Sequence, residues 1–307
     1  MLTPSRPLLK PRIRFDLTTI RLFIATAEHG SITKASAEQC LAVAAASRRI
    51  SELEAQLGVP LFERLPHGMA LTDAGRSLLA HARSMMHAVE RMHDDASAYL
   101  HGDKGVVRIA ACTSAVLQFL PGDISRFQAL HPDIHIDLQE QTSVGVVKLV
   151  GEGMADIGVF ESSIDGVALP TQPYREDELV VVTHSSHALA VRERLRIAEV
   201  LPYEFVGLSE GTAIGARLQR AAAKYAVTLR MRIRVNSFDS MLTMIRAGIG
   251  VGLMPRAVAD LFADTAEFTR IPLDEPWAAR QFVLCRQPAD SMPSAAVTVA
   301  DFLATQA

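Results

Sequence analysis

Residues 74–100 constrain the fold of this 307-residue chain more than any other segment. The segment contains no proline and a single glycine near its start. Its apolar side chains recur at alternating intervals of four and three residues, at Leu78, Ala82, Met85, Val89, Met92, Ala96 and Tyr99. This repeat predicts one amphipathic helix of roughly 40 Å with a coiled-coil seam. The helix would separate an N-terminal head from a C-terminal body. We expect its seam to dimerise the head; the alternative is packing against the chain's own body.

The head, residues 15–73, shows the spacing of three short helices followed by a hairpin. Asp16 can cap the first helix, and the next two are expected to end at about Leu41 and at Leu57. The turn at residues 66–68 lies between two short apolar runs, which predicts a small hairpin. This order of elements indicates a winged helix-turn-helix, with a small all-α packing domain as the alternative.

One face of the third helix is suited to the major groove of DNA. Opposite its apolar stripe it presents small or hydroxylated side chains and one arginine, namely Ala44, Ser47, Arg48 and Ser51. Such a surface can approach base edges closely, and Arg48 can bond guanine or phosphate. Residues 1–73 hold nine Lys and Arg against seven Asp and Glu, a net charge of +2, while the rest of the chain carries −5. A mildly basic head on an acidic body permits a DNA-binding module.

The body, which follows a hinge at residues 101–105, alternates strand and helix. Strands are expected at VVRIAA, IHIDLQ, ADIGVF, ELVVVTH, LRMRIRV and IGVGLMP, and one helix is expected from the first strand to about Ala129. This alternation predicts a parallel α/β sheet with helices on both faces. A body of about 200 residues can form two such lobes with a cleft between them.

Composition restricts the class of protein further. Hydrophobic residues make up 49% of the chain and charged residues 21%, which argues against disorder. No run of about 18 apolar residues occurs, so no membrane-spanning helix is expected. The basic, proline-rich residues 1–14 are interpreted as a flexible arm and not as a signal peptide. Cys40, Cys112 and Cys285 are far apart in the sequence, which favours free thiols in a reducing cytoplasm.

The chain lacks the sequence signatures of enzymes and metal sites. It contains no Walker loop, no GxSxG, no HExxH and no CxxC pair. Gly248, Gly250 and Gly252 end a helix and enter a strand, which is the wrong order for a dinucleotide loop and typical of a tight turn. We therefore expect no catalytic residue, no metal and no cofactor.

Five polar residues and one glycine lie where the body strands end and helices begin. They are Thr113, Ser114, Thr142, Glu161, Gly211 and Thr212. In open α/β sheets the ligand crevice lies beyond the strand ends, and helix N-termini bind anions. We expect these residues to hold a small organic anion in the cleft. Plain helix capping is the alternative for each hydroxyl, and an amine-bearing ligand is the alternative if Glu161 points inward.

The order of these parts resembles the LysR-type transcriptional regulators. In the head, the matching segments are FxATAEHGSITKAS (23–36), ASRRISELE (46–54), GVPLFER (58–64) and LTDAG (71–75). In the body, they are PDIHIDL (132–138), GxADIGVF (153–160) and GIGVGLMP (248–255). The resemblance covers residues 15–307, and the head motifs are the more specific.

The resemblance implies a fold that is α/β overall, with a mostly α-helical head. The expected parts are the arm at 1–14, a winged helix-turn-helix at 15–73, a linker helix and hinge at 74–102, and a bilobal, periplasmic-binding-protein-like effector domain at 103–307. Lobe I is expected at about 103–163 and 269–307, and lobe II at about 164–268. The resemblance further implies a homodimer through residues 74–100, commonly assembled into a tetramer, that binds two DNA half-sites.

The DNA contacts implied by the family depart from its usual pattern at one place. The recognition helix often opens with Ser-Gln-Pro, whereas this chain has Ala42-Val43-Ala44. Loss of the serine cap costs about 1 kcal/mol of local stability, and loss of the glutamine removes an amide that can read adenine. Val43 or Ala44 can contact thymine methyl groups instead. The expected DNA-binding residues are Thr33, Val43, Ala44, Ser47, Arg48, Ser51, Arg64 and His67.

The sequence therefore predicts a cytoplasmic transcription factor that a small molecule controls, and not an enzyme. Two alternatives share the bilobal body: a solute-binding protein and an enzyme. The DNA-binding-like head and the lack of a signal peptide disfavour the first alternative. The lack of a nucleophile–base pair or metal constellation disfavours the second.

Overall fold

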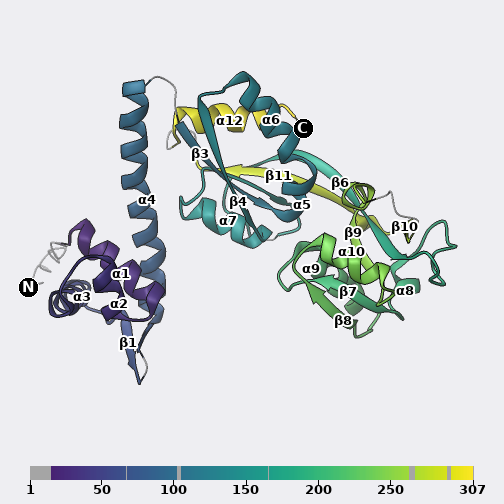
Figure 1. Cartoon of the computed structure of the whole chain (residues 1–307), viewed down its shortest axis with the longest axis horizontal. Coiled ribbons are helices and arrows are strands. Elements are labelled where there is room, and N and C mark those ends of the chain that lie inside the picture. The colour runs from purple at the N-terminus through teal and green to yellow at the C-terminus, as the bar shows by residue number, and fades with distance from the viewer. Residues whose placement is uncertain are drawn as a thin grey trace, which may run out of the picture. The chain divides into compact units, whose positions relative to one another are not determined.

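The computed structural model describes residues 15–66, 68–101, 105–164, 166–262, 267–288 and 292–306. The expected arm, the wing residue His67 and the hinge residues 102–104 lie outside the described residues, as do the side chains of residues 93–101. The chain forms two compact units that divide between His93 and Asp94, within a helix. Each unit is described by itself (Figure 1).

The first unit is a winged helix-turn-helix, as predicted. It contains α1 (Leu17–His29), α2 (Ile32–Glu38), α3 (Val43–Leu57), β1 (Phe62–Leu65), β2 (Gly68–Leu71) and the start of α4 (Asp73–His101). Strands β1 and β2 pair antiparallel and form the wing. Side chains from α1 and α3, including Ile20, Phe23, Ile50 and Leu53, form one buried core.

Capping residues set the helix ends in the head. Asp16 caps α1 by accepting the Thr19 N–H at 2.8 Å, and Gly30 ends α1 in the left-handed conformation. Helix α2 ends at Glu38, before the expected end at Leu41, because Cys40 has a φ of 53° that a right-handed helix cannot contain. Ala42 gives α3 no side-chain cap, as its sequence predicts.

Helix α4 runs unbroken as predicted, but the first apolar residues of its seam pack against the head. Ala82 is buried, and Leu78 and Met85 pack against the head core. These positions were expected at a dimer interface. Within a single chain they already pack on their own head, Ala82 fully buried and Leu78 and Met85 partly, because a helix that leaves a small domain buries its apolar stripe there. Further along, Val89 is half-buried and Met92 is 71% exposed.

The second unit contains all the remaining elements. They are β3 (Gly105–Cys112), α5 (Thr113–Gln118), α6 (Leu120–Leu130), β4 (Ile134–Gln141), α7 (Ser143–Gly151), β5 (Ile157–Glu161), β6 (Thr171–His184), α8 (Ile197–Val200), β7 (Glu204–Leu208), α9 (Ala213–Lys224), β8 (Arg230–Val235), α10 (Phe238–Arg246), β9 (Gly252–Pro255), α11 (Arg256–Asp260), β10 (Phe268–Pro272), the 3-10 helix η1 (Pro276–Ala278), β11 (Ala279–Arg286) and α12 (Ser294–Ala304).

The helix expected to run to about Ala129 is two helices, α5 and α6. They meet at Phe119, two residues before Pro121. Proline lacks an N–H and clashes with the preceding turn, so it is tolerated only near the start of a helix. The break leaves Thr113 and Ser114 on a short helix of their own, directly after β3.

The main sheet is mixed, whereas the alternation predicted a parallel one. Strands β4, β3 and β5 are parallel, but β11 pairs antiparallel with both β5 and β6, and β6 pairs antiparallel with β9 and β10. A separate parallel pair, β7 with β8, completes the unit. Strands β6 and β11 run side by side in opposite directions between the two lobes (Figure 1). A chain that leaves a lobe and returns beside its own path must pair antiparallel.

Two apolar cores identify the lobes. Tyr174, early in β6, lies in the core of lobe I, and Leu179, five residues later, lies in the core of lobe II. Lobe II also buries Phe268 and Ile271 of β10 and extends to Ala278 of η1. The chain therefore returns from lobe II to lobe I after Ala278, and not at the predicted boundary near residue 268. The reason is that β10 pairs with the lobe II part of β6.

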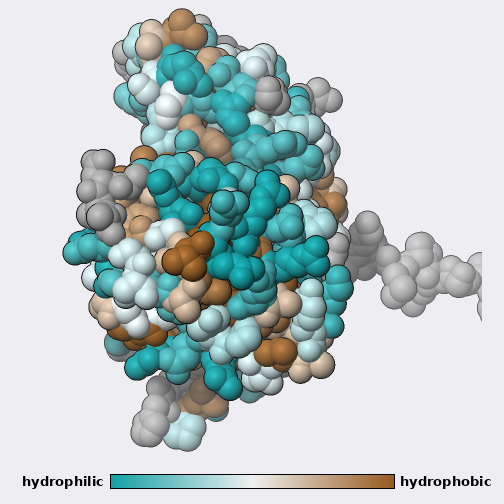
Figure 2. Space-filling view, turned by 90° about the vertical axis from the view of Figure 1, so that its right-hand side faces the viewer, coloured by the Kyte–Doolittle hydropathy of each residue, from teal (hydrophilic) through white to brown (hydrophobic). Residues whose placement is uncertain are grey.

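The face of the molecule in Figure 2 is mostly hydrophilic, and its apolar residues form small, separate groups. No helix within the described residues has the length and apolar character needed to cross a membrane.

We expect Asp16→Ala to lower the free energy of unfolding of the head by about 1 kcal/mol at neutral pH, because it removes the cap of α1. Hydrogen bonds from Thr19 and Arg49 lower the pKa of Asp16 from 3.8 to about 2. A carboxyl whose pKa is depressed by folding stabilises the folded chain above its unfolded pKa, and this stabilisation is lost as the pH falls through the folded pKa. The difference from wild type should therefore shrink between pH 3.8 and about pH 2.

Urea unfolding followed by circular dichroism measures this difference, and Trp277, the single tryptophan of the chain, reports separately on the body. Asp16→Asn is the control, since it keeps an N-cap oxygen without the charge. It should retain most of the stability and lose the pH dependence. If it titrates like the wild type, another group carries the effect.

Candidate functional site

The structure places the predicted DNA-reading face on the outside of α3. Ala46, Ile50 and Leu53 are buried, and on the opposite face Ala44 and Ser51 are exposed. Four further predicted residues of the head are also exposed: Thr33 on α2, Val43 and Arg48 on α3, and Arg64 on β1. Ser47 on α3 is half-buried.

Two neighbouring arginines of α3 have different environments. The Arg49 guanidinium donates to Asp16 at 3.0 Å and to the Thr19 hydroxyl at 3.0 Å, which ties α3 to α1. The Arg48 side chain is 81% exposed, and its one ion pair is with Glu52 on the next turn at 2.8 Å. An exposed pair of this kind contributes little to stability, so Arg48 can exchange it for another partner at low cost. Arg49 holds the helix in place, and Arg48 is available for a ligand.

In the second unit, five of the six predicted effector residues line one cavity between the lobes. Thr113, Ser114, Thr142 and Glu161 come from lobe I, and Thr212 comes from lobe II. Gly211 does not line the cavity, but a β-carbon there would lie 3.9 Å from the Thr142 methyl group, so the lobes face each other at this point. The cavity measures about 50 Å³. Since one water needs about 10–15 Å³, it admits only a few waters with the lobes in this position.

The hydroxyls of the cleft differ in the hydrogen bonds that they still have available. Thr113 donates to the Glu140 carboxylate at 2.6 Å, so its proton is engaged. Thr142 and Thr212 accept from the N–H groups of Gly145 and Gly215 at 3.1 and 3.3 Å, and their own protons remain free to donate. These two threonines are therefore helix caps and potential donors at the same time.

A buried ion pair lies behind Ser114. Arg280 of β11 is 2% exposed and stands directly opposite Asp177 in the β6–β11 register. Its Nε donates to Asp177 at 2.7 Å, and its Nη2 contacts both Asp177 and the Ser114 hydroxyl, the latter at 3.3 Å. Because Ser114 accepts from Arg280, its own proton points elsewhere. Gln118 also donates to Asp177, at 2.8 Å.

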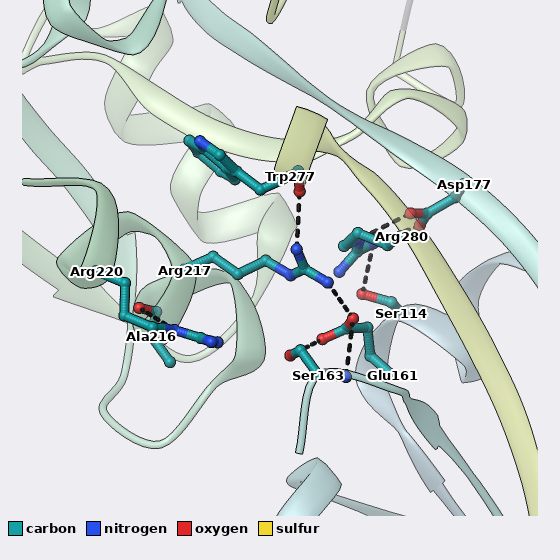
Figure 3. A network of polar contacts seen from close by, with 9 residues as sticks. All are labelled: Ser114, Glu161, Ser163, Asp177, Ala216, Arg217, Arg220, Trp277 and Arg280. Atoms are coloured by element: carbon teal, nitrogen blue, oxygen red, sulfur yellow. Dashed lines mark hydrogen bonds and ion pairs between the residues drawn. The ribbon is translucent and has the colours of Figure 1, made fainter. Parts of the chain in front are cut away.

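Glu161 is buried at the end of β5 and does not carry an unpaired charge. Arg217 of α9 forms an ion pair with it across the lobes and also donates to the Trp277 carbonyl at 2.9 Å (Figure 3). The backbone N–H and hydroxyl of Ser163 also donate to the carboxylate. The premise for an amine-bearing ligand, a free carboxylate facing the cleft, is therefore absent.

Cys112 also lines the cavity, as a buried thiol. Burial raises the pKa of Cys112, so the thiol is protonated at neutral pH. A protonated, buried thiol is a poor nucleophile and a poor metal ligand. Among the described residues, no group of three or more His, Cys, Asp or Glu side chains is arranged to hold a metal ion.

The two arginines at the cleft, Arg280 and Arg217, were not predicted from the sequence. Arg280 lies 166 residues beyond Ser114, and Arg217 lies 56 residues beyond Glu161, by the difference in sequence number, and neither arginine belongs to a local motif. Phe238 lines the same cavity from the start of α10 and was also missed. Alternating strands and helices predict where helices begin, but they do not predict which distant cation faces a given strand end.

Comparison with known families assigns both units. The profile described as "LysR substrate binding domain" matches residues 101–307, and the profile described as "Bacterial regulatory helix-turn-helix protein, lysR family" matches residues 17–76. The chain belongs to the LysR family. It is a LysR-type DNA-binding transcriptional regulator with an effector-binding domain.

Individual relatives of this LysR-type regulator are distant but cover almost its whole length. It is 24% identical to the RuBisCO operon transcriptional regulator of Allochromatium vinosum over 292 residues, covering 95% of this chain and 96% of that one. The structure of full-length CbnR complexed with its target DNA has a TM-score of 0.71 at 19% identity and covers 95% of this chain and 100% of that one.

The effector-binding domain of QuiR in complex with shikimate is similar to the second unit. The comparison gives a TM-score of 0.59 at 15% identity and covers 66% of this chain and 97% of that one. At such identities the solved structures establish the shared fold.

We expect Arg280→Met to destabilise the body by about 3–5 kcal/mol, because it leaves Asp177 buried without its cation. Arg256→Met is the matched control. Arg256 pairs with Glu178, the neighbour of Asp177 on β6, but this pair is largely exposed, so its loss should cost less than about 1 kcal/mol. Urea unfolding followed by Trp277 fluorescence measures both. Equal losses in the two variants would show that burial of the Arg280 pair has no special role.

Proposed function

We propose that this LysR-type regulator binds a two-half-site operator through α3 and the wing, and that a small organic anion between the lobes controls it. The observation that supports the first part most directly is the exposed Arg48 on a helix whose opposite face is buried in the head core. The exposed side chains beside it are small, which allows the backbone of α3 to approach base edges.

The DNA contacts follow from the environments of the head residues. Arg48 exchanges Glu52 for a guanine edge or a phosphate, while Ser47 and Ser51 bond bases or backbone. Val43 and Ala44 meet thymine methyl groups at the start of α3. Arg64 of β1 has no carboxylate partner among the described residues and contacts the backbone or minor groove from the wing, with His67 beside it in the sequence.

A dimer through α4 holds the two half-sites together. Leu78, Ala82 and Met85 are occupied by their own head, so the seam available to a partner starts at Val89 and Met92. An apolar side chain as exposed as Met92 on a long helix is suited to a facing helix. Two linked heads gain affinity for two sites by raising the effective concentration of the second.

We expect Arg48→Ala to weaken specific operator binding by about 1–3 kcal/mol, since it removes a base contact, and to leave stability nearly unchanged. Arg49→Ala is the matched control: it removes a neighbouring arginine but breaks the bonds to Asp16 and Thr19, so it should lower the stability of the head.

Fluorescence anisotropy of labelled operator and random DNA, with stoichiometry from light scattering, measures these effects. Two chains should bind per operator, and affinity should fall with salt. An equal loss on random DNA would reduce Arg48 to a phosphate contact, and failure of the wild type to bind any DNA at low salt would refute the proposed function.

The anionic class of effector is supported by the donors that converge on the cleft. Ser114, Thr142 and Thr212 each keep a free hydroxyl proton there. The first N–H groups of α7 and α9 have no acceptor within their helices. Helix N-termini also favour negative charge. Glu161, which would repel a carboxylate, is neutralised by Arg217.

Binding requires the lobes to change position. A cavity of about 50 Å³ is too small for an organic acid of several carbon atoms. A ligand that enters it selects an arrangement with more separated lobes, and differential affinity for two arrangements is what allows an effector to regulate. The ligand is bound and not converted, since the thiol of Cys112 is protonated and Glu161 is engaged. Binding to DNA and three unpaired thiols support a cytoplasmic location.

We expect Ser114→Ala and Thr142→Val each to weaken effector binding about tenfold or more, because each removes a hydrogen bond to a charged group. Thr113→Val is the matched control, since its proton is already engaged by Glu140, and it should have a smaller effect. A thermal-shift screen of organic acids and of amines on the full chain identifies the ligand, and calorimetry measures the variants. A ligand that binds all variants equally would place the site elsewhere.

A further inference from the structure

A second cavity lies on lobe II, at the side of α9 and η1, and the proposed function does not use it. It measures about 210 Å³, roughly four times the cleft. Its lining residues include three basic residues of α9 (Arg217, Arg220 and Lys224), two aromatic residues (Tyr225 and Trp277) and one acidic residue, Glu275. The cations follow each other at intervals of three and four residues, which places them on one face of the helix.

Within the part of the chain that the structure describes, two cations of this cavity lack the carboxylate partners that most arginines of the body have. Most arginines of the second unit are paired with a carboxylate, such as Arg192 with Glu199 and Arg246 with Glu267. Arg220 and Lys224 have no carboxylate partner among the described residues, and Arg220 bonds only the Ala216 carbonyl, at 3.4 Å. Two like charges one helical turn apart repel each other unless an anion lies between them.

The other charged groups of the cavity are already engaged. Arg217 is paired with Glu161 (Figure 3), and Glu275 accepts the N–H of Ile197 at 3.0 Å. With Arg217 neutralised, the cavity holds two free positive charges against the one carboxylate. A net positive charge remains, in a body whose sequence carries an excess of acidic residues. An anion is therefore the ligand that the cavity attracts.

The aromatic side chains specify the shape of that anion. Two aromatic residues, Trp277 and Tyr225, line the cavity, and Ala221 and Ile197 add apolar wall. A cavity of about 150 Å³ is enough for a benzene ring, so about 210 Å³ accepts one ring with a carboxylate attached. Planar rings stack against tryptophan and tyrosine, and carboxylates pair with arginine and lysine.

We propose that this cavity is a second ligand site, separate from the cleft, that binds a small aromatic carboxylate between Arg220, Lys224 and Trp277. Arg217 connects the two sites, because this residue lines the cavity and its guanidinium contacts Glu161 and the Trp277 carbonyl. A ligand here therefore acts on the ion pair that joins the lobes. The proposal does not depend on DNA binding or on the identity of the effector in the cleft.

The test uses the intact chain and the fluorescence of Trp277, its only tryptophan. Benzoate, 4-hydroxybenzoate and phenylacetate are titrated, with calorimetry as a second readout. Benzyl alcohol presents the ring without the charge, acetate the charge without the ring, and inorganic phosphate a different anion. We expect saturable binding of at least one aromatic acid, with all three comparison compounds about tenfold weaker or more.

Variants locate the site. Arg220→Gln and Lys224→Gln should each weaken binding of that acid about tenfold, because each removes one charged partner. Arg230→Gln is the matched control: it removes an exposed arginine of the same lobe that does not line the cavity. Thr142→Val in the cleft should leave this binding unchanged.

Three results would overturn the proposal: no saturable binding of any of the acids, equal affinity for benzyl alcohol, acetate or phosphate, or equal affinity in the Arg220→Gln and Lys224→Gln variants. Loss of binding in Thr142→Val alone would also overturn the proposal, because it would assign the acid to the cleft. None of these measurements involves DNA. A negative result would therefore overturn the second ligand site without bearing on the proposed DNA binding by the head.

Discussion

The buried ion pair between Arg280 and Asp177 is the interaction on which the arrangement of the body depends. It lies between the two strands that join the lobes, at the point where β6 leaves the core of lobe I and enters that of lobe II. Burial of two charges is tolerated only with complete pairing, so the two strands are held in one register. The same guanidinium contacts Ser114, which couples the crossing of the strands to the edge of the cleft.

Pairing of charge also separates the residues that support the fold from those that can meet a ligand. Arg49 and Arg280 are bound to carboxylates of other elements, and both hold elements together. Arg48 pairs only with a neighbour on its own helix, and Arg220 has no carboxylate partner among the described residues. Arginine keeps its charge in all these places, so the difference lies in what surrounds it. The same residue type thus holds elements together in two places and is available to a ligand in two others.

The hydroxyls of the cleft show how far local pattern carries a functional prediction. Their positions after strands predicted that Thr113, Ser114, Thr142 and Thr212 would gather at one edge, and they do. Their chemistry was not predictable, because it depends on partners from distant segments: Glu140 engages the proton of Thr113, while Arg280 leaves that of Ser114 free. Glu161 was expected to repel a carboxylate ligand if it pointed into the cleft. Its neutralisation was not predictable either, because its partner Arg217 lies on the other lobe.

The sequence by itself determined the order of the elements, the winged head, the long helix and the family, because spacing, caps and motifs are properties of neighbouring residues. It did not determine the antiparallel crossing of β6 and β11, the break at Phe119 or the use of the first part of the α4 seam within the head. Pairing of strands and burial of a helix face depend on which distant segments meet. Only the tertiary structure decided which cations are neutralised and which remain free, since a charge is paired by proximity in space and not in sequence.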